Sequence, residues 1–348
     1  MPDRETFPES EARTPRPSRG DVPAEGDALS ARPVGGLVLL GVLTVLWGSN
    51  WPAMKLALRE LDPWTFRTIC LLVGGGGLLA LVRMGGQSLR VPRLERRPLA
   101  LAAFFNITAW HLCSAYGLTL VQAGRAAIIA YTMPLWTVIF ARLLVGERIT
   151  PRRLAALGLG LAGMAALVAP GASALWHEPA GILLMVGAAG SWAFGTVLIK
   201  AQRWTIPISA LTGWQVILGA VPIALGALLR SVTTGDSGVA ARLTTLSSAA
   251  LLGTAYATFV GVIFCHWAWF RLVSILPAAV ASIGTLGIPI VGLFTSALVL
   301  GEPVGMPEIV ALVLVVGGLA ILIGGMVSGA AESPTGSGAV STIERRST

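Results

Sequence analysis

The chain has 348 residues, of which 54% are hydrophobic and only 12% are charged, and its mean hydropathy is +0.76. This composition excludes a water-soluble domain of ordinary make-up and indicates an integral membrane protein. The formal net charge of +8 does not indicate nucleic acid binding, because the arginines lie in loops beside apolar segments, where they set membrane orientation.

Both ends of the chain differ in composition from the rest. Residues 1–34 and 329–348 are rich in polar and small residues and carry no apolar period, so we expect two disordered tails. The first apolar run starts late and is long, which favours a retained helix over a cleaved signal peptide. Three cysteines, Cys70, Cys113 and Cys265, fall inside apolar runs without metal-site spacing. We therefore expect no metal site, disulfide framework or cofactor.

Ten apolar segments follow one another between the tails. They cover approximately residues 35–58, 63–83, 99–120, 123–145, 153–170, 180–200, 207–229, 248–271, 276–300 and 308–328. Runs of about 20 apolar residues can cross a ~30 Å hydrocarbon core as helices. They lack the alternation of a porin strand, and so the sequence predicts an all-α integral membrane protein with ten transmembrane helices.

A fourteen-residue phrase occurs twice, as PLWTVIFARLLVGE at 134–147 and PIVGLFTSALVLGE at 289–302. The same shift of 155 residues places His111 over His266, and a shift of 145 places Lys55 over Lys200. These matches indicate a tandem duplication, with one repeat over residues 35–170 and the other over residues 180–328. Five spans per repeat is an odd number, so the copies should form inverted-topology repeats, as in many secondary transporters.

The basic loops predict the orientation. Arginines cluster between the second and third spans and between the fourth and fifth, whereas the loops on the opposite side carry fewer basic residues. The positive-inside rule therefore places both termini in the cytoplasm.

Several motifs resemble those of the EamA-type members of the drug/metabolite transporter superfamily. They are the two Pro-to-Gly-Glu phrases, WGSNWPAMK in the first span, PWTFR at the start of the second, and WQVILGA in the seventh. The resemblance extends over about residues 35–328. It implies a bacterial inner-membrane transporter of small metabolites that works by alternating access, with a central cavity between the halves. Members handle amino acids, sugars and nucleotide precursors, so the family does not define the substrate.

The charged residues within the spans are the first candidates for a site, because a charge held in hydrocarbon is costly. Four cations lie there, Lys55, Arg67, Arg125 and Lys200, and no carboxylate falls in the middle of a span. This imbalance favours an anionic or zwitterionic solute. The alternatives are that both lysines snorkel to the interface, that Arg125 is interfacial, and that Arg67 packs structurally.

His111 and His266 occupy equivalent positions in the two repeats. Histidine titrates near neutral pH, so the pair is a candidate for carrying a coupling proton. The alternative is two neutral histidines that make hydrogen bonds between helices.

Aromatic and amide side chains within the spans complete the predicted lining, with Asn106 among them. The candidate substrate-binding set is Asn50, Arg67, Trp110, Tyr116, Arg125, Tyr131, Gln215 and Tyr256. Four residues of the repeated phrases have either a gating or a structural role: Pro134, Glu147, Pro289 and Glu302. Glycines in the last span of each repeat allow close helix approach, within the bundle or in a homodimer, and the oligomeric state stays open.

Three classes of function compete. The sequence has no reactive constellation of an enzyme and no GxxxxGK[ST] motif of an ATP-driven pump. No sequence motif excludes a channel, but the duplication favours a transporter that works by alternating access. We therefore predict a secondary transporter that exports a small polar metabolite such as an amino acid or its derivative. Its expected partners are this solute and the lipid bilayer. The alternatives are uptake of a sugar or nucleoside, or a channel-like or non-transport protein.

Overall fold

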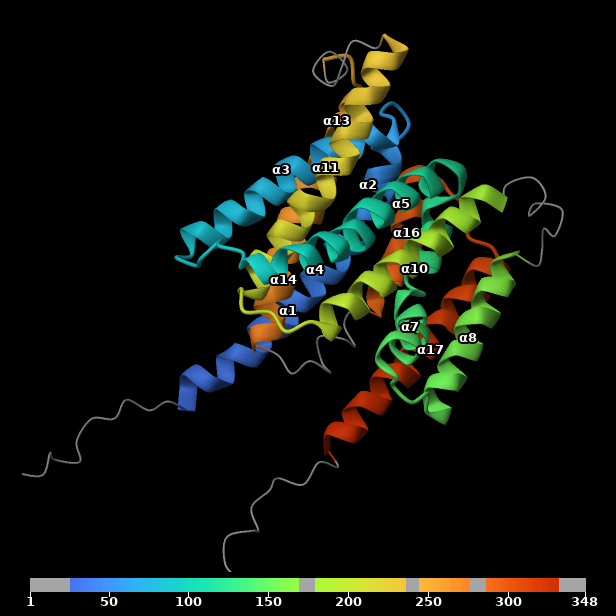
Figure 1. Ribbon diagram of the computed structural model, residues 1–348. Helices are drawn as coiled ribbons and strands as arrows, with labels where there is room; N and C mark the ends of the chain where they lie inside the picture. Colours follow the sequence, from blue (N-terminus) through green and yellow to red (C-terminus); the bar gives the residue numbers. More distant parts are fainter. Residues whose placement is uncertain (1–25, 169–178, 236–243, 276–285, 332–348) are drawn as a thin grey trace, which may run out of the picture.

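The structure is a computed structural model that describes residues 26–168, 179–235, 244–275 and 286–331 (Figure 1). Within these ranges the regular elements are all helical and none is a strand. This confirms the all-α prediction for the described part of the chain. Most of the predicted tails, and residues 276–285 at the start of the predicted ninth span, lie outside the described residues.

The first half contains eight α-helices and one π-helix. They are α1 (Gly26–Gly48), α2 (Asn50–Ala57), α3 (Pro63–Met84), α4 (Arg93–Ala103), η1 (Phe104–Ala109), α5 (Trp110–Leu120), α6 (Ala123–Ala130), α7 (Met133–Val145) and α8 (Pro151–Val168). The helix α1 begins at Gly26, before residue 35, where the tail was expected to end.

The described part of the second half follows a similar order. It contains α10 (Pro179–Ala201), α11 (Ile208–Thr234), α13 (Ser248–Ala255), η3 (Tyr256–Phe264), α14 (Cys265–Ile275), α16 (Gly287–Leu300) and α17 (Met306–Ala331). Across the described residues, seven helical segments are long and apolar enough to cross a membrane. Two shorter apolar helices, Gly287–Leu300 and Met306–Ile321, add to them. The count of ten spans stays a prediction.

Local chemistry explains where several helices begin and end. Asp62 caps α3, because its Oδ1 accepts hydrogen bonds from the backbone N–H groups of Trp64 (3.1 Å) and Thr65 (3.2 Å), and Pro63 then occupies the first helical position. The glycine of each Gly-Glu pair ends a helix: Gly146 has φ of 74° and Gly301 has φ of 68°. Only glycine adopts this left-handed conformation without strain, which explains why the phrase ends as it does.

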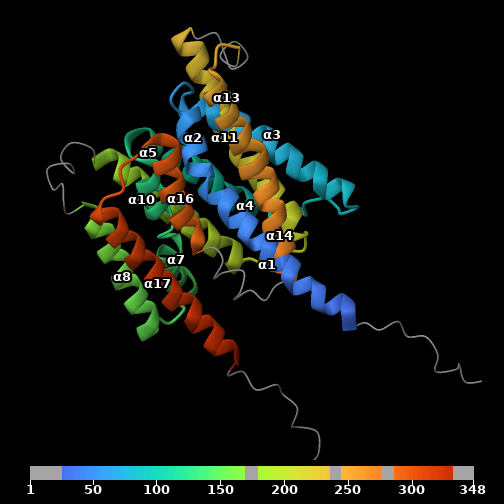
Figure 2. The ribbon, with the colours of Figure 1, turned by 180° about the vertical axis from the view of Figure 1, so that it is seen from behind.

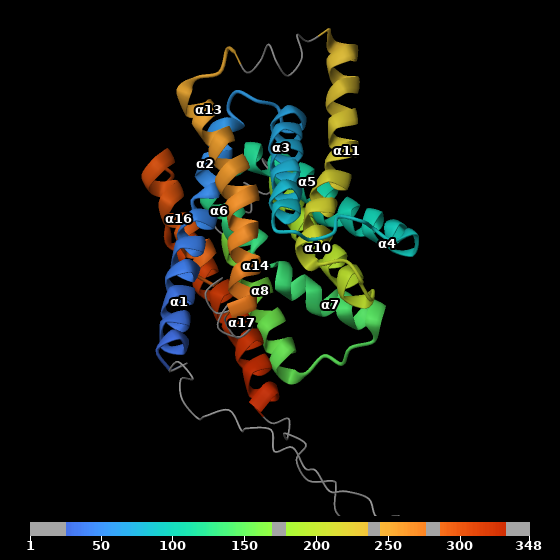
Figure 3. The ribbon, with the colours of Figure 1, turned by 90° about the vertical axis from the view of Figure 1, so that its left-hand side faces the viewer.

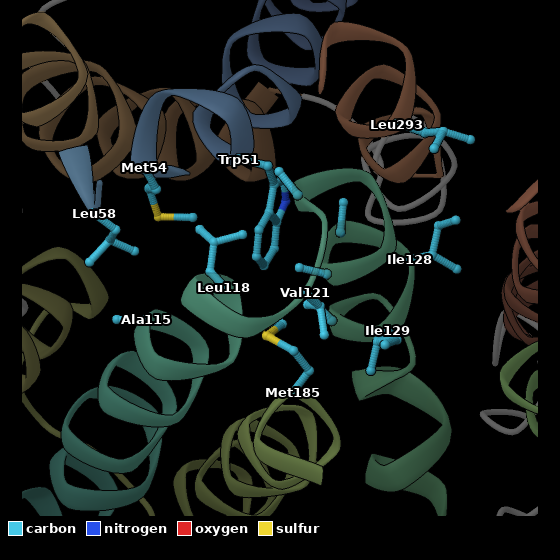
Figure 4. Close-up of a cluster of buried hydrophobic side chains, with 14 of the residues drawn as sticks. Trp51, Met54, Leu58, Ala115, Leu118, Val121, Ile128, Ile129, Met185 and Leu293 are labelled. Carbon is cyan, nitrogen blue, oxygen red and sulfur yellow. The ribbon is translucent and has the colours of Figure 1, made fainter. Parts of the chain in front are cut away.

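The main hydrophobic core lies where α2, α5, α6 and α10 meet (Figure 4). Trp51 of α2 extends towards Leu118 and Val121, and Met185 approaches the same cluster from α10. These side chains are at most 8% exposed. The core therefore joins helices of both halves rather than forming one core per half.

The helices α8 and α17 lie side by side in opposite directions along one edge of the molecule (Figures 1 and 2). Two glycines permit this close approach. A Cβ added at Gly163 would lie 3.0 Å from the carbonyl oxygen of Ala311, and one added at Gly318 would lie 2.9 Å from that of Ala156. These two glycines therefore serve packing within the bundle. The two contacts are related by the 155-residue shift.

The beginning of α1 and the end of α17 lie towards the same side of the molecule (Figures 1 and 2). Seen from a third direction, α4 projects sideways from the bundle near α11 (Figure 3).

Candidate functional site

Arg67 is the most deeply buried cation of the described chain, with 3% of its surface exposed. It lies on α3, one turn after the cap, and its Nε donates a hydrogen bond to the His111 carbonyl oxygen (3.1 Å). Its Nη2 donates to Ser114 Oγ (3.1 Å) on the same helix, α5. No carboxylate among the described residues forms an ion pair with it. The guanidinium is therefore held in position while its charge stays uncompensated.

One of the predicted histidines, His111, lies near this arginine, and the other, His266, lies near His111. His111 on α5 interacts electrostatically with Arg67 and with His266 on α14. Nδ1 of His111 is buried without a hydrogen-bond partner in the described structure, whereas the His266 ring interacts with the backbone of Val262 and Gly261. The ring of His266 contacts Trp47 edge-on, with centroids 5.6 Å apart. The structure thus brings together Arg67, His111 and His266, which the sequence named separately, and we call these three residues the polar centre.

Two π-helical segments flank the polar centre. The segment η1 covers 104–109 and η3 covers 256–264, so the 155-residue shift places η1 within η3. Each precedes one of the histidines in the chain. Short π-helical segments are rare in proteins and often mark functional sites, because widening the helix frees backbone groups and redirects side chains.

Asparagine–glycine contacts join the first span of each half to the π-helix of the other. A Cβ added at Gly261 in η3 would lie 2.7 Å from Asn50 Oδ1, and one added at Gly195 in α10 would lie 1.9 Å from Asn106 Oδ1. Gly195 is the repeat equivalent of Asn50, and Gly261 that of Asn106, so the same contact occurs twice with its partners exchanged. Both Oδ1 atoms are buried without a hydrogen-bond partner within the described residues.

Gln215, a predicted binding residue, is 7% exposed, and its Oε1 accepts a hydrogen bond from Asn106 Nδ2 (3.2 Å). Asn106 belongs to this arrangement but was absent from the predicted binding set. Its amide within an apolar run was the available signal, and the duplication hid its importance because the equivalent position is Gly261.

The predicted aromatic residues lie at different places around the polar centre. Trp110, next to His111 in the chain, contacts Trp192 with ring centroids 5.4 Å apart. Tyr256 Oη donates a hydrogen bond to the Leu46 carbonyl oxygen (3.0 Å), near the break between α1 and α2. Tyr131 is half-buried directly after α6, and Tyr116 is half-buried on α5.

Arg125 pairs with Glu308 instead of standing alone. Its Nη2 lies 2.7 Å from Glu308 Oε1, and the carboxylate side chain is 4% exposed. Nearby, Glu302 accepts hydrogen bonds from the backbone N–H groups of Ala123 (2.8 Å) and Gly124 (3.0 Å) at the beginning of α6. Glu302 in the linker between α16 and α17 and Glu308 in the first turn of α17 thus both bind α6 through their carboxylates, and we call these contacts the α6 latch.

Glu147, which ends the first phrase as Glu302 ends the second, has different partners. Its carboxylate lies 2.6 Å from Lys200 Nζ and 3.1 Å from Arg153 Nη1, so it links the α7–α8 loop with α8 and the end of α10. The hydrogen bond from Lys200 is the main influence that holds the pKa of Glu147 below its usual value, and the Arg153 hydrogen bond and both positive charges add to it.

The remaining singled-out residues lie at helix ends. Lys55 Nζ donates a hydrogen bond to the Val121 carbonyl oxygen (2.7 Å) just after α5 ends, where a cation is favourable. Pro134 lies in the first turn of α7, directly after the break that separates α6 from α7. Pro289 is buried in the first turn of α16. Within the described residues, no group of three or more His, Cys, Asp and Glu residues could hold a metal ion.

The apolar membrane-length helices, with a buried arginine among them, define a multi-pass membrane protein. The chain belongs to the EamA-like transporter family, which matches residues 34–169 and again residues 179–324. The family resemblance read from the motifs is thereby confirmed.

Named relatives agree with this class. The chain is 28% identical over 284 residues to the uncharacterized transporter YvbV of Bacillus subtilis (strain 168), covering 80% of this chain and 88% of that protein. It is 25% identical over 296 residues to a probable amino-acid metabolite efflux pump of Salmonella typhimurium (strain LT2), covering 84% and 95%. One solved crystal structure has a TM-score of 0.56 at 21% identity and covers 85% of this chain and 98% of its own, which supports the fold alone.

Proposed function

We propose that the protein is a secondary transporter that exports a small polar metabolite bearing a carboxylate, such as an amino acid or its derivative. The observation that carries the proposal is Arg67, a buried cation without a carboxylate partner in the described chain. A site with an uncompensated positive charge favours a solute that supplies the negative charge. The export direction follows the relative in Salmonella typhimurium described as a probable amino-acid metabolite efflux pump.

Alternating access between two inverted five-helix repeats is the mechanism that we infer. Two pairs of contacts support it. Gly163 meets Ala311 as Gly318 meets Ala156, and Asn50 meets Gly261 as Asn106 meets Gly195. Exchanged partners of this kind are expected when two similar halves face each other across a pseudo-two-fold axis. With an axis in the membrane plane, one rocking motion exposes a central site to either side in turn.

In this proposal the protein is an inner-membrane protein with ten spans and both termini in the cytoplasm. The beginning of α1 and the end of α17 lie towards the same side of the molecule, which supports placing both termini on one side of the membrane (Figures 1 and 2). We infer that the α6 latch holds the opposite side closed, since it fastens the second half to the first with two backbone hydrogen bonds and an ion pair.

His111 and His266 are assigned to proton coupling. Nδ1 of His111 lacks a partner in the described structure, so this ring is not committed to a structural hydrogen bond through that atom, whereas the His266 ring interacts with the Val262 and Gly261 backbone. A binding site that carries a positive charge attracts an anionic solute, and protonation of either imidazole would strengthen that attraction. Transport of the solute and movement of a proton would then depend on each other.

The first test is counterflow with the purified protein in liposomes, using a panel of labelled amino acids with and without a pH gradient. Saturable counterflow of one solute, accelerated by the gradient, is the expected result. Flux that fails to saturate would favour a channel. No counterflow of any amino acid would reject this substrate class and direct the search to sugars, nucleosides and organic acids.

Arg67→Ala should abolish counterflow of the carboxylate-bearing solute, because it removes the buried charge. Ser114→Ala is the matched control, since it removes one of the hydrogen bonds to Arg67 but leaves the charge. Arg67→Lys should retain part of the flux with a raised KM, because the charge remains but the guanidinium geometry is lost. Unchanged kinetics of Arg67→Ala in normally expressed protein would reject the assigned role.

His111→Gln should remove the pH dependence of counterflow and retain part of the flux at high pH, where the native imidazole is neutral. The measurement is the initial rate from pH 5 to 8 in native protein, His111→Gln and His266→Gln. A pH profile that survives in both variants would rule out proton coupling through these side chains.

A further inference from the structure

Five exposed arginines lie between the end of α3 and the first turns of α4, at Arg83, Arg90, Arg93, Arg96 and Arg97. The segment 83–97 contains a single carboxylate, Glu95, which is 5% exposed. Its Oε1 accepts a hydrogen bond from the Thr205 backbone N–H (3.0 Å), so the negative charge faces the protein. The outer face of the segment consequently carries positive charge alone, and we call residues 83–97 the basic platform.

Contacts with the second half hold the basic platform in place. Trp214 Nε1 donates a hydrogen bond to the Leu89 carbonyl oxygen (2.8 Å). Ser209 Oγ lies 2.6 Å from Gln87 Oε1 and donates to it. Because the backbone is fastened at these points, the arginines extend from an ordered base, and a ligand that binds them does not first have to order the loop.

Large apolar side chains stand among the arginines. Met84 is 82% exposed and Leu94 is 91% exposed. Further along the chain, Leu101 of α4 is 50% exposed and Phe104 at the start of η1 is 47% exposed. Cations beside exposed apolar groups suit the boundary between lipid headgroups and acyl chains, where both kinds of group find partners. A soluble phosphate would satisfy the arginines but would leave the apolar side chains in water.

We propose that the basic platform binds the phosphate headgroups of anionic phospholipids, while Met84 and Leu94 enter the acyl region beside them. The occupant is a lipid rather than a soluble anion because charge complementarity and apolar exposure occur in one segment. Since the platform belongs to the first half but is fastened to α11 and to the linker before it, a bound lipid would touch the junction between the halves.

Native mass spectrometry of the full-length protein in detergent tests the proposal, with phosphatidylglycerol and phosphatidylcholine of equal chain length as probes. The native protein should retain phosphatidylglycerol in preference. The variant with Arg90, Arg93, Arg96 and Arg97 all replaced by Gln should bind it on the order of tenfold more weakly or worse, because each cation near anionic lipid contributes to the attraction. The same four positions replaced by Lys should keep most of the preference.

Arg59→Gln is the matched single-charge control, because Arg59 is also exposed but precedes α3 and so lies at the opposite end of that helix. It should leave phosphatidylglycerol binding unchanged. Equal retention of the two lipids by the native protein, or full retention by the Gln variant, would overturn the proposal. If the Gln variant fails to fold, Met84→Ser with Leu94→Ser supplies the test: weaker retention of long-chain phosphatidylglycerol supports the platform, and unchanged retention refutes it.

Discussion

Replacing Glu302 by Ala should open the side of the protein that the α6 latch closes. In the structure this carboxylate accepts hydrogen bonds from the Ala123 and Gly124 backbone N–H groups at the beginning of α6, and both residues are buried. Alanine would leave two buried donors without partners in the closed conformation. Opening lets those donors reach water, so the substitution penalises the closed state more than the open one.

The magnitude follows from the number and type of bonds. Hydrogen bonds to a charged acceptor contribute about 1.5–3 kcal/mol each, and water recovers a large part of that on opening. A net bias of about 2 kcal/mol for the pair corresponds to roughly a 30-fold shift between closed and open states, at 1.4 kcal/mol per factor of ten. Glu302→Gln keeps a neutral acceptor and should produce a smaller shift in the same direction.

The assay is the alkylation rate of a single cysteine one turn below the latch. Ala126 is 0% exposed on α6, so Ala126→Cys in a chain whose three native cysteines are replaced reports access from that side. Adding Glu302→Ala should raise the rate with a small water-soluble thiosulfonate reagent by about 30-fold. Equal rates with and without Glu302→Ala would refute the reasoning and leave Glu302 as a helix cap that does not affect opening.

Other predictions concern packing and pH. Gly195→Ala should destabilise the protein by about 1–3 kcal/mol and reduce flux, because the new Cβ would lie 1.9 Å from Asn106 Oδ1. The control is Gly190→Ala, whose new Cβ would have nothing within 4 Å, and it should leave the thermal unfolding midpoint unchanged. The Glu147–Lys200 link should stabilise the fold above the ordinary glutamate pKa of about 4.3 and be lost as the pH falls through the lowered folded-state value. The measurement is the thermal unfolding midpoint as a function of pH, which should fall less steeply at acidic pH in Glu147→Gln than in the native protein. The difference should be small because the lysine is exposed. An identical decrease in both proteins would contradict the assignment.

The repeated phrase shows where prediction from the sequence reaches its limit. Its glycines end α7 and α16 in the same left-handed conformation, as the identical spacing leads one to expect. The glutamates that follow have unrelated partners, a helix N-terminus for Glu302 and two cations for Glu147. The backbone rule depends on neighbouring residues, but the side-chain partners depend on which distant helix lies beside the loop.

Arg125 illustrates the same point for the candidate site. Hydropathy placed a cation in an apolar segment, and the sequence left open whether it faced a solute or an interface. Its partner Glu308 lies 183 residues further along the chain and contacts it because the beginning of α17 packs against α6. Arg67, His111 and His266 were singled out individually, and packing of α3, α5 and α14 brings them together.

By itself the sequence determined that the protein lies in a membrane, that it is helical, that it is duplicated and which family it belongs to, because each of these depends on composition or on a pattern repeated along the chain. A lipid environment requires every segment to satisfy its own backbone, so apolar length alone predicts helices. Tertiary structure decided which polar groups meet: the latch on α6, the exchanged asparagine–glycine contacts, and His111 next to both Arg67 and His266. Those contacts depend on which helix faces meet and join residues 44 or more positions apart in the chain, which local periodicity does not encode.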